Sequence, residues 1–219
     1  MKQFINVLKK ASVFKYIPDN EILELLECFG WRTKEYTKNE MIISEGDIVS
    51  EFGIVLSGRA RSLKLDISGK VFTLTLLAPG SMTGVLLAAS MERKSSVSVQ
   101  VLDDACMLFV PFAQITKRCP KGCQGHEQLL LNYFDSVAEW ALLLHDRNDC
   151  LIKPSVRSKV LEYLSRVSRE SGSNTFSVPF DRHGMAEYLN VERSALSREL
   201  SRMKKDGILD FHKESFRLL

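Results

Sequence analysis

Three successive patterns of apolar and polar positions run along the chain. From about Met41 to Val110, apolar and polar residues alternate, and glycines interrupt the alternation at Gly46, Gly58, Gly69, Gly80 and Gly84. A period of two with regular turn residues predicts many short strands, as in a sandwich or small barrel. Residues 2–30 predict mainly helix before these strands, with one apolar face that consists of Ile22, Leu25, Leu26 and Phe29.

From about Gly125 to Asn148 the period becomes helical. One apolar seam has spacings of three and four residues, and it consists of Leu130, Tyr133, Val137, Trp140 and Leu144. A second apolar set lies on another side of the same helix and consists of Leu131, Phe134, Ala138 and Leu142. Since both sides must be buried, we expect one to pack on the strand domain and the seam to form the interface of a homodimer. A single helix buried within a monomer is the alternative.

A third unit follows Lys153-Pro154. Residues 155–170 predict a helix, the stretch FSVPF predicts a short strand, and Asp181 stands at the N-cap of another helix. That helix ends near Asn190, and the next begins around Glu192. Two helices joined by so tight a turn predict a helix-turn-helix. After Gly207, the stretch ILDFHKESFRLL predicts a two-stranded wing with its turn near residues 213–214.

The second of these helices has two different sides. At about 100° per residue, the apolar residues Leu196, Leu200 and Met203 fall together. Nearly opposite are cations and short hydroxyls: Arg193, Ser194, Ser197, Arg198, Ser201, Lys204 and Lys205. Residues 153–219 contain 13 Lys and Arg but only 9 Asp and Glu, so this unit is mildly basic. The pattern favours a helix that reads the major groove of DNA, although a solvated helix face looks similar.

Composition bears on the compartment and on metal sites. Residues 71–91 carry no charge, but Pro79-Gly80 and the alternation before it predict a strand and a turn rather than a membrane span. The N-terminal MKQFINVLKK lacks the apolar core of a signal peptide. Five cysteines, an odd number, fit a reducing compartment, and we expect a cytoplasmic protein. Cys119 and Cys123 lack the usual Cys-x-x-Cys spacing and the others are scattered, so we expect no metal site and no iron–sulfur cluster; a redox role for this pair stays open.

The chain resembles the CRP/FNR family of bacterial transcription regulators over nearly its whole length. The recognition helix of the family is similar to Arg193-Ser-Ala-Leu196-Ser197-Arg198-Glu-Leu200, and APGSMTG at 78–84 resembles the turn before its phosphate-binding cassette. The resemblance implies an α+β chain with three parts. These are a β-roll (jelly-roll) effector-sensing domain at 1–122, a dimerisation helix at 123–152 and a winged helix-turn-helix DNA-binding domain at 153–219.

The resemblance further implies a homodimeric, sequence-specific DNA-binding regulator, not an enzyme, with a palindromic operator and RNA polymerase as partners. Arg193 and Arg198 are the expected contacts to guanine or phosphate, and Ser194 stands where many relatives have a base-reading Glu. The expected phosphate contacts are Ser197, Ser201, Lys204 and Arg182. A ligand-binding signalling module without DNA binding is the rival hypothesis.

The expected effector pocket lies between the β-roll and the long helix and is lined by Gly84, Val85, Leu86, Ser95, Ser96 and Tyr133. In the cyclic-nucleotide cassette of the family, Glu and Arg bind the ribose and the phosphate. Here Val85 follows Gly84, and Lys94-Ser95 replaces the Arg-Ser pair, so we expect an effector other than cyclic AMP. The alternative is a cavity filled by Leu86 and Leu87 without a ligand.

Two further expectations concern haem and the switching mechanism. All four histidines lie outside the strand domain and only His126, at the start of the long helix, is close to it, so we do not expect a haem. A haem- or redox-sensing regulator of the same fold stays an alternative. We expect the effector to bias the pairing of the long helices and to reorient the DNA-binding domains through a hinge near Lys153-Pro154.

Overall fold

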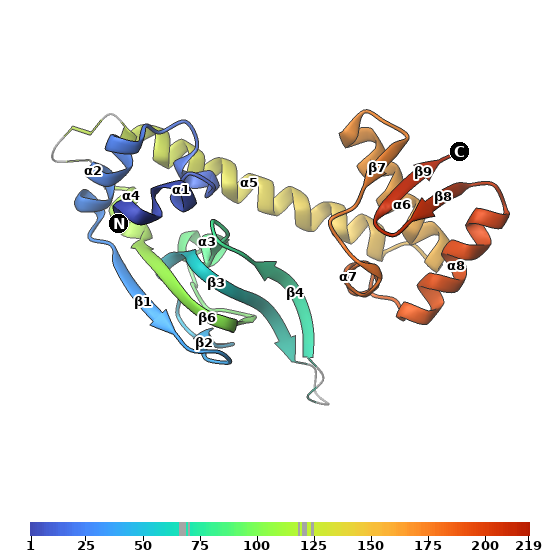
Figure 1. Cartoon of the computed structure of the whole chain (residues 1–219). Helices are drawn as coiled ribbons and strands as arrows, with labels where there is room; N and C mark the ends of the chain where they lie inside the picture. Colours follow the sequence, from blue (N-terminus) through green and yellow to red (C-terminus); the bar gives the residue numbers. More distant parts are fainter. Residues whose placement is uncertain (66–68, 70, 118, 120–121, 124) are drawn as a thin grey trace. The chain divides into compact units, whose positions relative to one another are not determined.

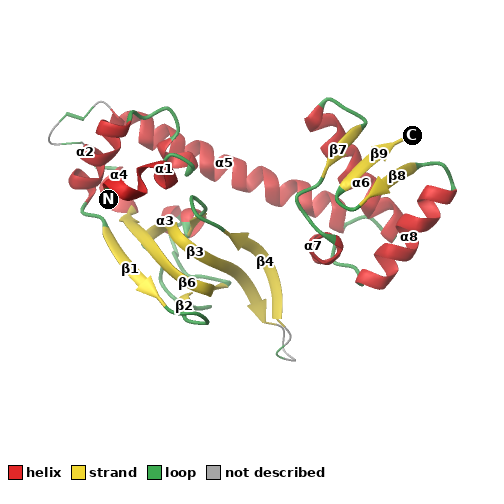
Figure 2. Ribbon diagram, in the orientation of Figure 1, coloured by secondary structure: helices red, strands yellow, loops and turns green. Residues whose placement is uncertain are grey.

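The computed structural model describes residues 1–65, 69, 71–117, 119, 122–123 and 125–219 (Figure 1). The chain divides into two compact units, Met1–Trp140 and Ala141–Leu219. Both units combine helices and strands (Figure 2), which confirms the expected α+β class. Within the described ranges, no helix combines the length and the apolar composition that crossing a bilayer requires.

Short helical segments open the first unit: η1 (Lys2–Phe4), α1 (Ile5–Leu8), η2 (Ser12–Phe14) and α2 (Asp19–Phe29). Helix α2 buries the apolar face that its sequence predicts, Ile22, Leu25, Leu26 and Phe29. The helix stops at Gly30, whose φ of 66° is left-handed and is tolerated by glycine without strain. The N-terminal segment thus supplies one apolar layer against the sheet.

The sheet of the first unit contains β1 (Arg32–Tyr36), β2 (Met41–Ile43), β3 (Glu51–Leu65), β4 (Val71–Leu77), β5 (Met82–Thr83) and β6 (Ser98–Pro111). Its order is β1-β6-β3-β4, with β2 paired to β6 and β5 to β3, all antiparallel. Phe52 and Ile54 of β3 join the core that includes α2, whereas Val55 joins a second core on the other side. Two short helices complete the unit: α3 (Val85–Ala89) and α4 (Phe112–Ile115).

Strand β3 corrects one of the expected breaks. The strand runs on through Gly58, where its pairing with β6 shifts register. Gly58 has a φ of 77°, and a Cβ at this position would collide with the carbonyl oxygen of Asp104 and with Ala105. Glycine therefore permits a bulge in a continuous strand instead of ending the strand. Strand β1 was not predicted, because four of its five side chains are exposed and its sequence, RTKEY, has no apolar alternation.

The long helix α5 (Gly125–Leu151) has two apolar sides, as expected, but the N-terminal part of the expected dimer seam packs on the core of its own chain. Tyr133 is fully buried in the core of its own chain, and Leu130 and Val137 pack against the same core. Its ring lies 5.3 Å from that of Phe52 and 5.1 Å from that of Phe112. The expectation that Tyr133 contacts a second copy is therefore wrong. The exposed apolar residues of α5 instead include Leu131, Phe134, Leu142 and Leu144.

The second unit contains α6 (Val156–Ser171), β7 (Thr175–Ser177), α7 (Arg182–Tyr188), α8 (Arg193–Lys205), β8 (Leu209–His212) and β9 (Ser215–Leu218). Its strands pair antiparallel in the order β7-β9-β8. The core includes Val160, Leu164, Met185, Leu196, Leu200, Met203 and Phe216. These elements confirm the expected helices, the short strand and the two-stranded wing.

The last turns of α5 also belong to the second unit. Cys150 is buried in its core, and Arg147 donates hydrogen bonds to the carbonyl oxygens of Glu187 and Tyr188 at the end of α7. Lys153, in the turn between α5 and α6, pairs with Glu162 at 3.0 Å. The turn at Lys153-Pro154 thus lies inside one compact unit, and the hinge expected there stays a prediction. The division between the units falls after Trp140, within α5.

Candidate nucleic-acid interface and effector region

Helix α8 presents a polar face that its packing leaves open. Leu196, Leu200 and Met203 are fully buried, so they fix the rotation of the helix about its axis. The opposite side chains are all exposed: Arg193, Ser194, Ser197, Arg198, Ser201, Lys204 and Lys205. We call these seven residues the α8 face. The amphipathic spacing in the sequence therefore predicted both sides of the helix correctly.

Interactions between residues close in sequence form the turn before α8. The side chain of Asp181 accepts a hydrogen bond from the backbone N–H of Gly184 at 2.7 Å and so caps α7. Asn190 adopts a left-handed φ of 49° just after α7, which lets the chain reverse within a few residues. The backbone N–H of Val191 then donates to the carbonyl of Ala186. This tight connection holds the first turn of α8 at the surface of the second unit.

A salt-bridge network anchors α8 on the side away from the α8 face. Arg157 of α6 donates from Nε to Glu199 Oε1 at 2.6 Å and pairs through Nη2 with Asp206 Oδ2 at 2.6 Å. The carboxyl groups of Glu199 and Asp206 raise the pKa of Arg157. The acidic residues of α8 and its C-terminus thus interact with α6, and the α8 face keeps only cations and hydroxyls.

The cations of the α8 face differ in their neighbours. Arg193 and Arg198 have no ion-pair partner among the described residues. Lys204 pairs with Asp210 of the wing, and its ammonium group lies 5.5 Å from the centre of the Phe211 ring. An arginine without a carboxylate partner keeps all its donors for a ligand. Arg193 and Arg198 are therefore the cations best prepared to bind an anion.

Arg182, expected at phosphate, has a different environment. Its guanidinium carbon lies 4.7 Å from the ring centre of Phe211 and 5.0 Å from that of Phe216. Burial lowers the pKa of Arg182, although the side chain is still partly accessible. The residue joins the start of α7 to the wing by cation–π contacts. In this structure Arg182 packs against the wing through the rings of Phe211 and Phe216.

Two further cations near this surface were missed by the sequence reasoning. Arg202 of α8 is exposed and lies 3.7 Å from Glu199, measured from Nη1 to Oε2. Lys213 stands at the tip of the wing, where its φ of 53° is left-handed. The turn at 213–214 was predicted, so the signal for Lys213 was present in the sequence. A cation at the tip of the turn is a further candidate for phosphate contact.

The expected effector pocket is partly closed in this structure. The hydroxyl of Tyr133 donates to the carbonyl oxygen of Val85 at 2.6 Å, so α5 is bonded directly to the first turn of α3. Burial raises the pKa of Tyr133. Val85, Tyr133 and Ser95 are buried, whereas Gly84 and Leu86 are half-buried and Ser96 is exposed. Val85 and Tyr133 belong to the core, which corrects their assignment to the lining of an open pocket.

The cassette residues do not fit a cyclic-nucleotide phosphate. The position after Gly84 holds the apolar Val85, and Lys94 is exposed with its backbone bridged to Ile48. The Ser95 hydroxyl donates to the carbonyl of Val97 at 2.7 Å, within its own turn. A buried phosphate needs charge-assisted donors. The matching positions hold Val85 and Lys94-Ser95, so neither a carboxylate for the ribose nor a buried cation for the phosphate stands at them.

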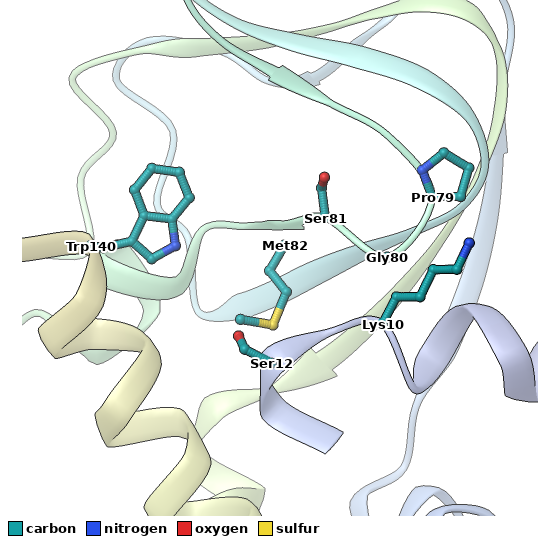
Figure 3. Close-up of a pocket in the computed structure, with 7 residues that line it drawn as sticks. All are labelled: Lys10, Ser12, Pro79, Gly80, Ser81, Met82 and Trp140. Atoms are coloured by element: carbon teal, nitrogen blue, oxygen red, sulfur yellow. The ribbon is translucent and has the colours of Figure 1, made fainter. Parts of the chain in front are cut away.

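A pocket of about 300 Å³ lies elsewhere in the first unit (Figure 3). It is lined by Lys10, Ser12, Pro79, Gly80, Ser81, Met82 and Trp140. The turn between β4 and β5 forms one wall, and the indole of Trp140 stands at one end. The expected pocket residues are not among those that line it. This pocket includes Trp140 of α5, but it is not formed by the cassette residues that the sequence predicted as its lining.

The first unit also brings together cysteines that are far apart in the sequence. The Sγ atoms of Cys28, Cys119 and Cys123 all lie within 4.8 Å of one another. The neighbouring thiols of Cys28 and Cys119 raise the pKa of Cys123 to about 12. The separation of Cys28 from the other two by about 90 residues hid this cluster. Cys28 therefore corrects the expectation that only Cys119 and Cys123 could lie close together.

His126 is a buried residue of the first turn of α5. Its Nε2 lies 2.8 Å from the carbonyl oxygen of Ile115, and its ring meets Phe29 edge-on at 5.1 Å. Nδ1 has no hydrogen-bond partner within the described residues. His126 is 9% exposed, so this side chain is part of the interior of the first unit. The ring packs in the junction of α2 with α5.

Comparison with known proteins bears on both units. Residues 33–119 match the family described as the cyclic nucleotide-binding domain, and residues 158–219 match the Crp-like helix-turn-helix domain. The transcriptional activator protein FnrL of Cereibacter sphaeroides is 24% identical over 87% of this chain and 77% of that protein. The cyclic AMP receptor protein of Thermus thermophilus is 23% identical over 92% of this chain and 89% of that protein. These relatives are transcription regulators, not enzymes.

Solved structures show the same fold. The chain is similar to the c-di-GMP responsive global regulator CLP of Xanthomonas campestris, with a TM-score of 0.62, 14% identity and coverage of 92% of this chain and 99% of that one. It is also similar to a CooA mutant from Carboxydothermus hydrogenoformans, with a TM-score of 0.61, 20% identity and 90% coverage of both chains. With both domain families matched in this order, the chain belongs to the CRP/FNR family of DNA-binding transcription regulators.

Proposed function

We propose that the chain binds a palindromic operator as a homodimer, with α8 of each copy in a major groove. The observation that carries this proposal is the α8 face, where Arg193 and Arg198 are exposed and have no ion-pair partner among the described residues. An arginine fork matches the two acceptors of guanine, and short hydroxyls bind phosphate oxygens. Arg157 pairs with Glu199 and Asp206, the acidic side chains of α8 and its C-terminus, on the side away from this face.

Support for the homodimer comes from α5. Leu131, Phe134, Ala138 and Leu142 recur at spacings of three and four residues and are all exposed. Phe134 and Leu142 expose 56% and 61% of their surface, which is costly for large apolar side chains unless a partner covers them. A parallel pair of α5 helices would bury this row. Two recognition helices must then lie about 34–36 Å apart to enter successive major grooves.

A small-molecule effector other than cyclic AMP would control this dimer. The Tyr133–Val85 hydrogen bond supports a route for such control, because any ligand that moves α3 changes a contact made directly by α5. An effector shifts the equilibrium only through its preference for one of the two states. We further propose that the dimer works in the cytoplasm, where it affects RNA polymerase at promoters.

The test of DNA binding uses the full chain and fluorescent duplexes selected from random sequence. Wild type should bind with an affinity that falls steeply as salt rises, since cations replace counterions on phosphate. R193A/R198A should lose this binding. R169A/K2A, which removes equal charge at two exposed cations outside α8, is the matched control and should retain most of it. Failure of the wild type to bind duplex DNA at every ionic strength would contradict the proposal.

The effector has its own test. Native mass spectrometry of the chain purified from its own host should show a retained small molecule, and cyclic AMP should give no thermal stabilisation. Stabilisation by cyclic AMP at low concentration would refute our interpretation of the cassette. DNA binding would still stand in that case, because the α8 face does not depend on the cassette.

A further inference from the structure

Three thiols from two distant segments meet at one corner of the first unit. Cys28 lies on the last turn of α2, and Cys119 and Cys123 lie in the segment that leads into α5. The Sγ atoms of Cys28 and Cys123 are 3.4 Å apart, and all three Sγ atoms lie within 4.8 Å of one another. We call these residues the three-cysteine cluster. Each residue is half-buried, so the sulfur atoms are neither sealed in the core nor fully solvated.

The fold brings α2 unusually close to the start of α5. A Cβ at Gly125 would lie 2.8 Å from Glu21 Oε2 and 3.0 Å from Leu25 Cδ1, so only glycine permits this approach without a shift. Cys28 follows Leu25 by three residues and therefore lies on the same side of α2. Phe29, the next residue, contacts His126 in the first turn of α5. The position of Cys28 next to Cys123 is thus set by helix packing.

The spacing of the sulfur atoms suits one metal ion. Zinc binds thiolate at about 2.3 Å in tetrahedral geometry, which places two sulfur ligands about 3.8 Å apart. The observed Sγ–Sγ distances, 3.4 Å for one pair and at most 4.8 Å for the others, are close to this value. Movements of about 1 Å or less would bring all three sulfur atoms to ligand positions. Soft thiolate ligands select zinc and copper(I) over magnesium or calcium.

We propose that Cys28, Cys119 and Cys123 form a thiolate site for a single soft metal ion, for which Zn²⁺ is the probe. Three thiolates occupy three corners of the tetrahedron, and water or an external ligand takes the fourth. On binding, each S–H bond is replaced by an S–Zn bond and the proton is released to solvent, so no oxidant or reductant is needed. The ion would join the end of α2 to the segment that enters α5.

The first test uses the full-length chain, reduced with a phosphine and freed of metal. Titration of Zn²⁺ against a chromophoric chelator should give one ion per chain. Cobalt(II), added in its place, should produce thiolate-to-cobalt charge-transfer absorption together with the strong visible bands of a tetrahedral site. Zinc should also slow the alkylation of Cys28, Cys119 and Cys123 in wild type, as measured by mass spectrometry, while Cys106 keeps its rate. This last readout needs no variant.

The second test uses single substitutions. C28S, C119S and C123S should each weaken zinc binding at least about 10-fold, because a lost ligand costs no less than a lost outer-shell partner. C106S is the matched control, since Cys106 lies on β6 and is not part of the cluster; it should bind zinc like wild type. Circular dichroism confirms that each variant is folded. C28S is the decisive change, because it comes from a different segment than the other two.

Three results would overturn the proposal. The first is a folded, reduced wild type that binds no zinc and shows no protection from alkylation. The second is binding that C28S leaves unchanged, which would reveal adventitious metal on other groups. The third is iron with acid-labile sulfide in protein purified without oxygen, which would assign the three-cysteine cluster to an iron–sulfur centre instead of a mononuclear site.

Discussion

Arg166 Nη1 donates a hydrogen bond to Asp146 Oδ2 at 2.7 Å and so joins the middle of α6 to the C-terminal part of α5. The Arg166 side chain is largely buried, and its Nη2 donates to the hydroxyl of Tyr188 at 3.0 Å. This contact, with those of Arg147, fastens the end of α5 to the DNA-binding unit. Any rotation of this part of α5 therefore carries the α8 face with it.

Removal of Asp146 should destabilise the second unit. In D146A the guanidinium of Arg166 stays buried, and its polar partners among the described residues are then Tyr188 and, at 3.9 Å, Glu170. We expect the free energy of unfolding in urea to fall by about 1–3 kcal/mol. D146L/R166M, which removes both polar partners, should lie closer to wild type than D146A does. Additive losses in the double variant would contradict the pairing.

Arg198 should contribute to sequence-specific binding. If its guanidinium reads a base, R198A should weaken binding to the operator by about 1–3 kcal/mol and leave binding to random DNA much less affected. Fluorescence anisotropy at a fixed salt concentration measures both. R169A is the control of equal charge on α6. Equal losses on operator and random DNA would place Arg198 on the phosphate backbone.

The exposed row of α5 gives a test of the homodimer. L131E/F134E should convert dimers to monomers in analytical ultracentrifugation, because both side chains lie on the open side of the helix. Exposed positions tolerate such changes with little loss of stability, about 0.5 kcal/mol each, so the variant should stay folded. L76E, at an exposed leucine of β4, is the matched control and should remain dimeric. A dimeric L131E/F134E would disprove this interface.

Substitution of Gly58 should cost more unfolding free energy than substitution of a glycine of similar backbone conformation. In G58A, the left-handed φ and the collision with the Asp104 carbonyl should together cost at least about 2 kcal/mol of unfolding free energy. Gly30 has a φ of 66°, and a Cβ added there would meet nothing within 4 Å, so G30A should lose only about 1 kcal/mol. Urea titration monitored by tryptophan fluorescence compares the two. Equal losses would show that β6 moves to accommodate the methyl group.

Local signals predicted the second unit well. The Asp181 cap, the left-handed Asn190 and the buried stripe Leu196, Leu200 and Met203 each depend on residues within one or two turns of chain. These features can be predicted from nearby sequence because helix caps and amphipathic faces are short-range features. The open polar side of α8 followed from the same stripe.

Long-range relations were not predictable in the same way. Which side of α5 faces its own sheet depends on where the hydroxyl of Tyr133 meets Val85, 48 residues earlier in the chain. The contact of Cys28 with Cys123 spans 95 residues, and the bulge at Gly58 depends on its register with β6. Periodicity gives the number of apolar sides but not their partners. At these points the structure differs from the arrangement that the sequence pattern predicted.

The Tyr133–Val85 hydrogen bond gives a final prediction about the effector region. Y133F keeps the ring against Phe52 and Phe112 but leaves the buried carbonyl of Val85 without this donor. We expect a loss of about 1–2 kcal/mol of unfolding free energy, with faster amide exchange confined to α3 and its neighbours. Y16F, at a tyrosine that is 79% exposed, should behave like wild type in both measurements. If α3 exchanges no faster in Y133F, the bond does not couple α5 to α3, and the proposed route for the effector fails with it.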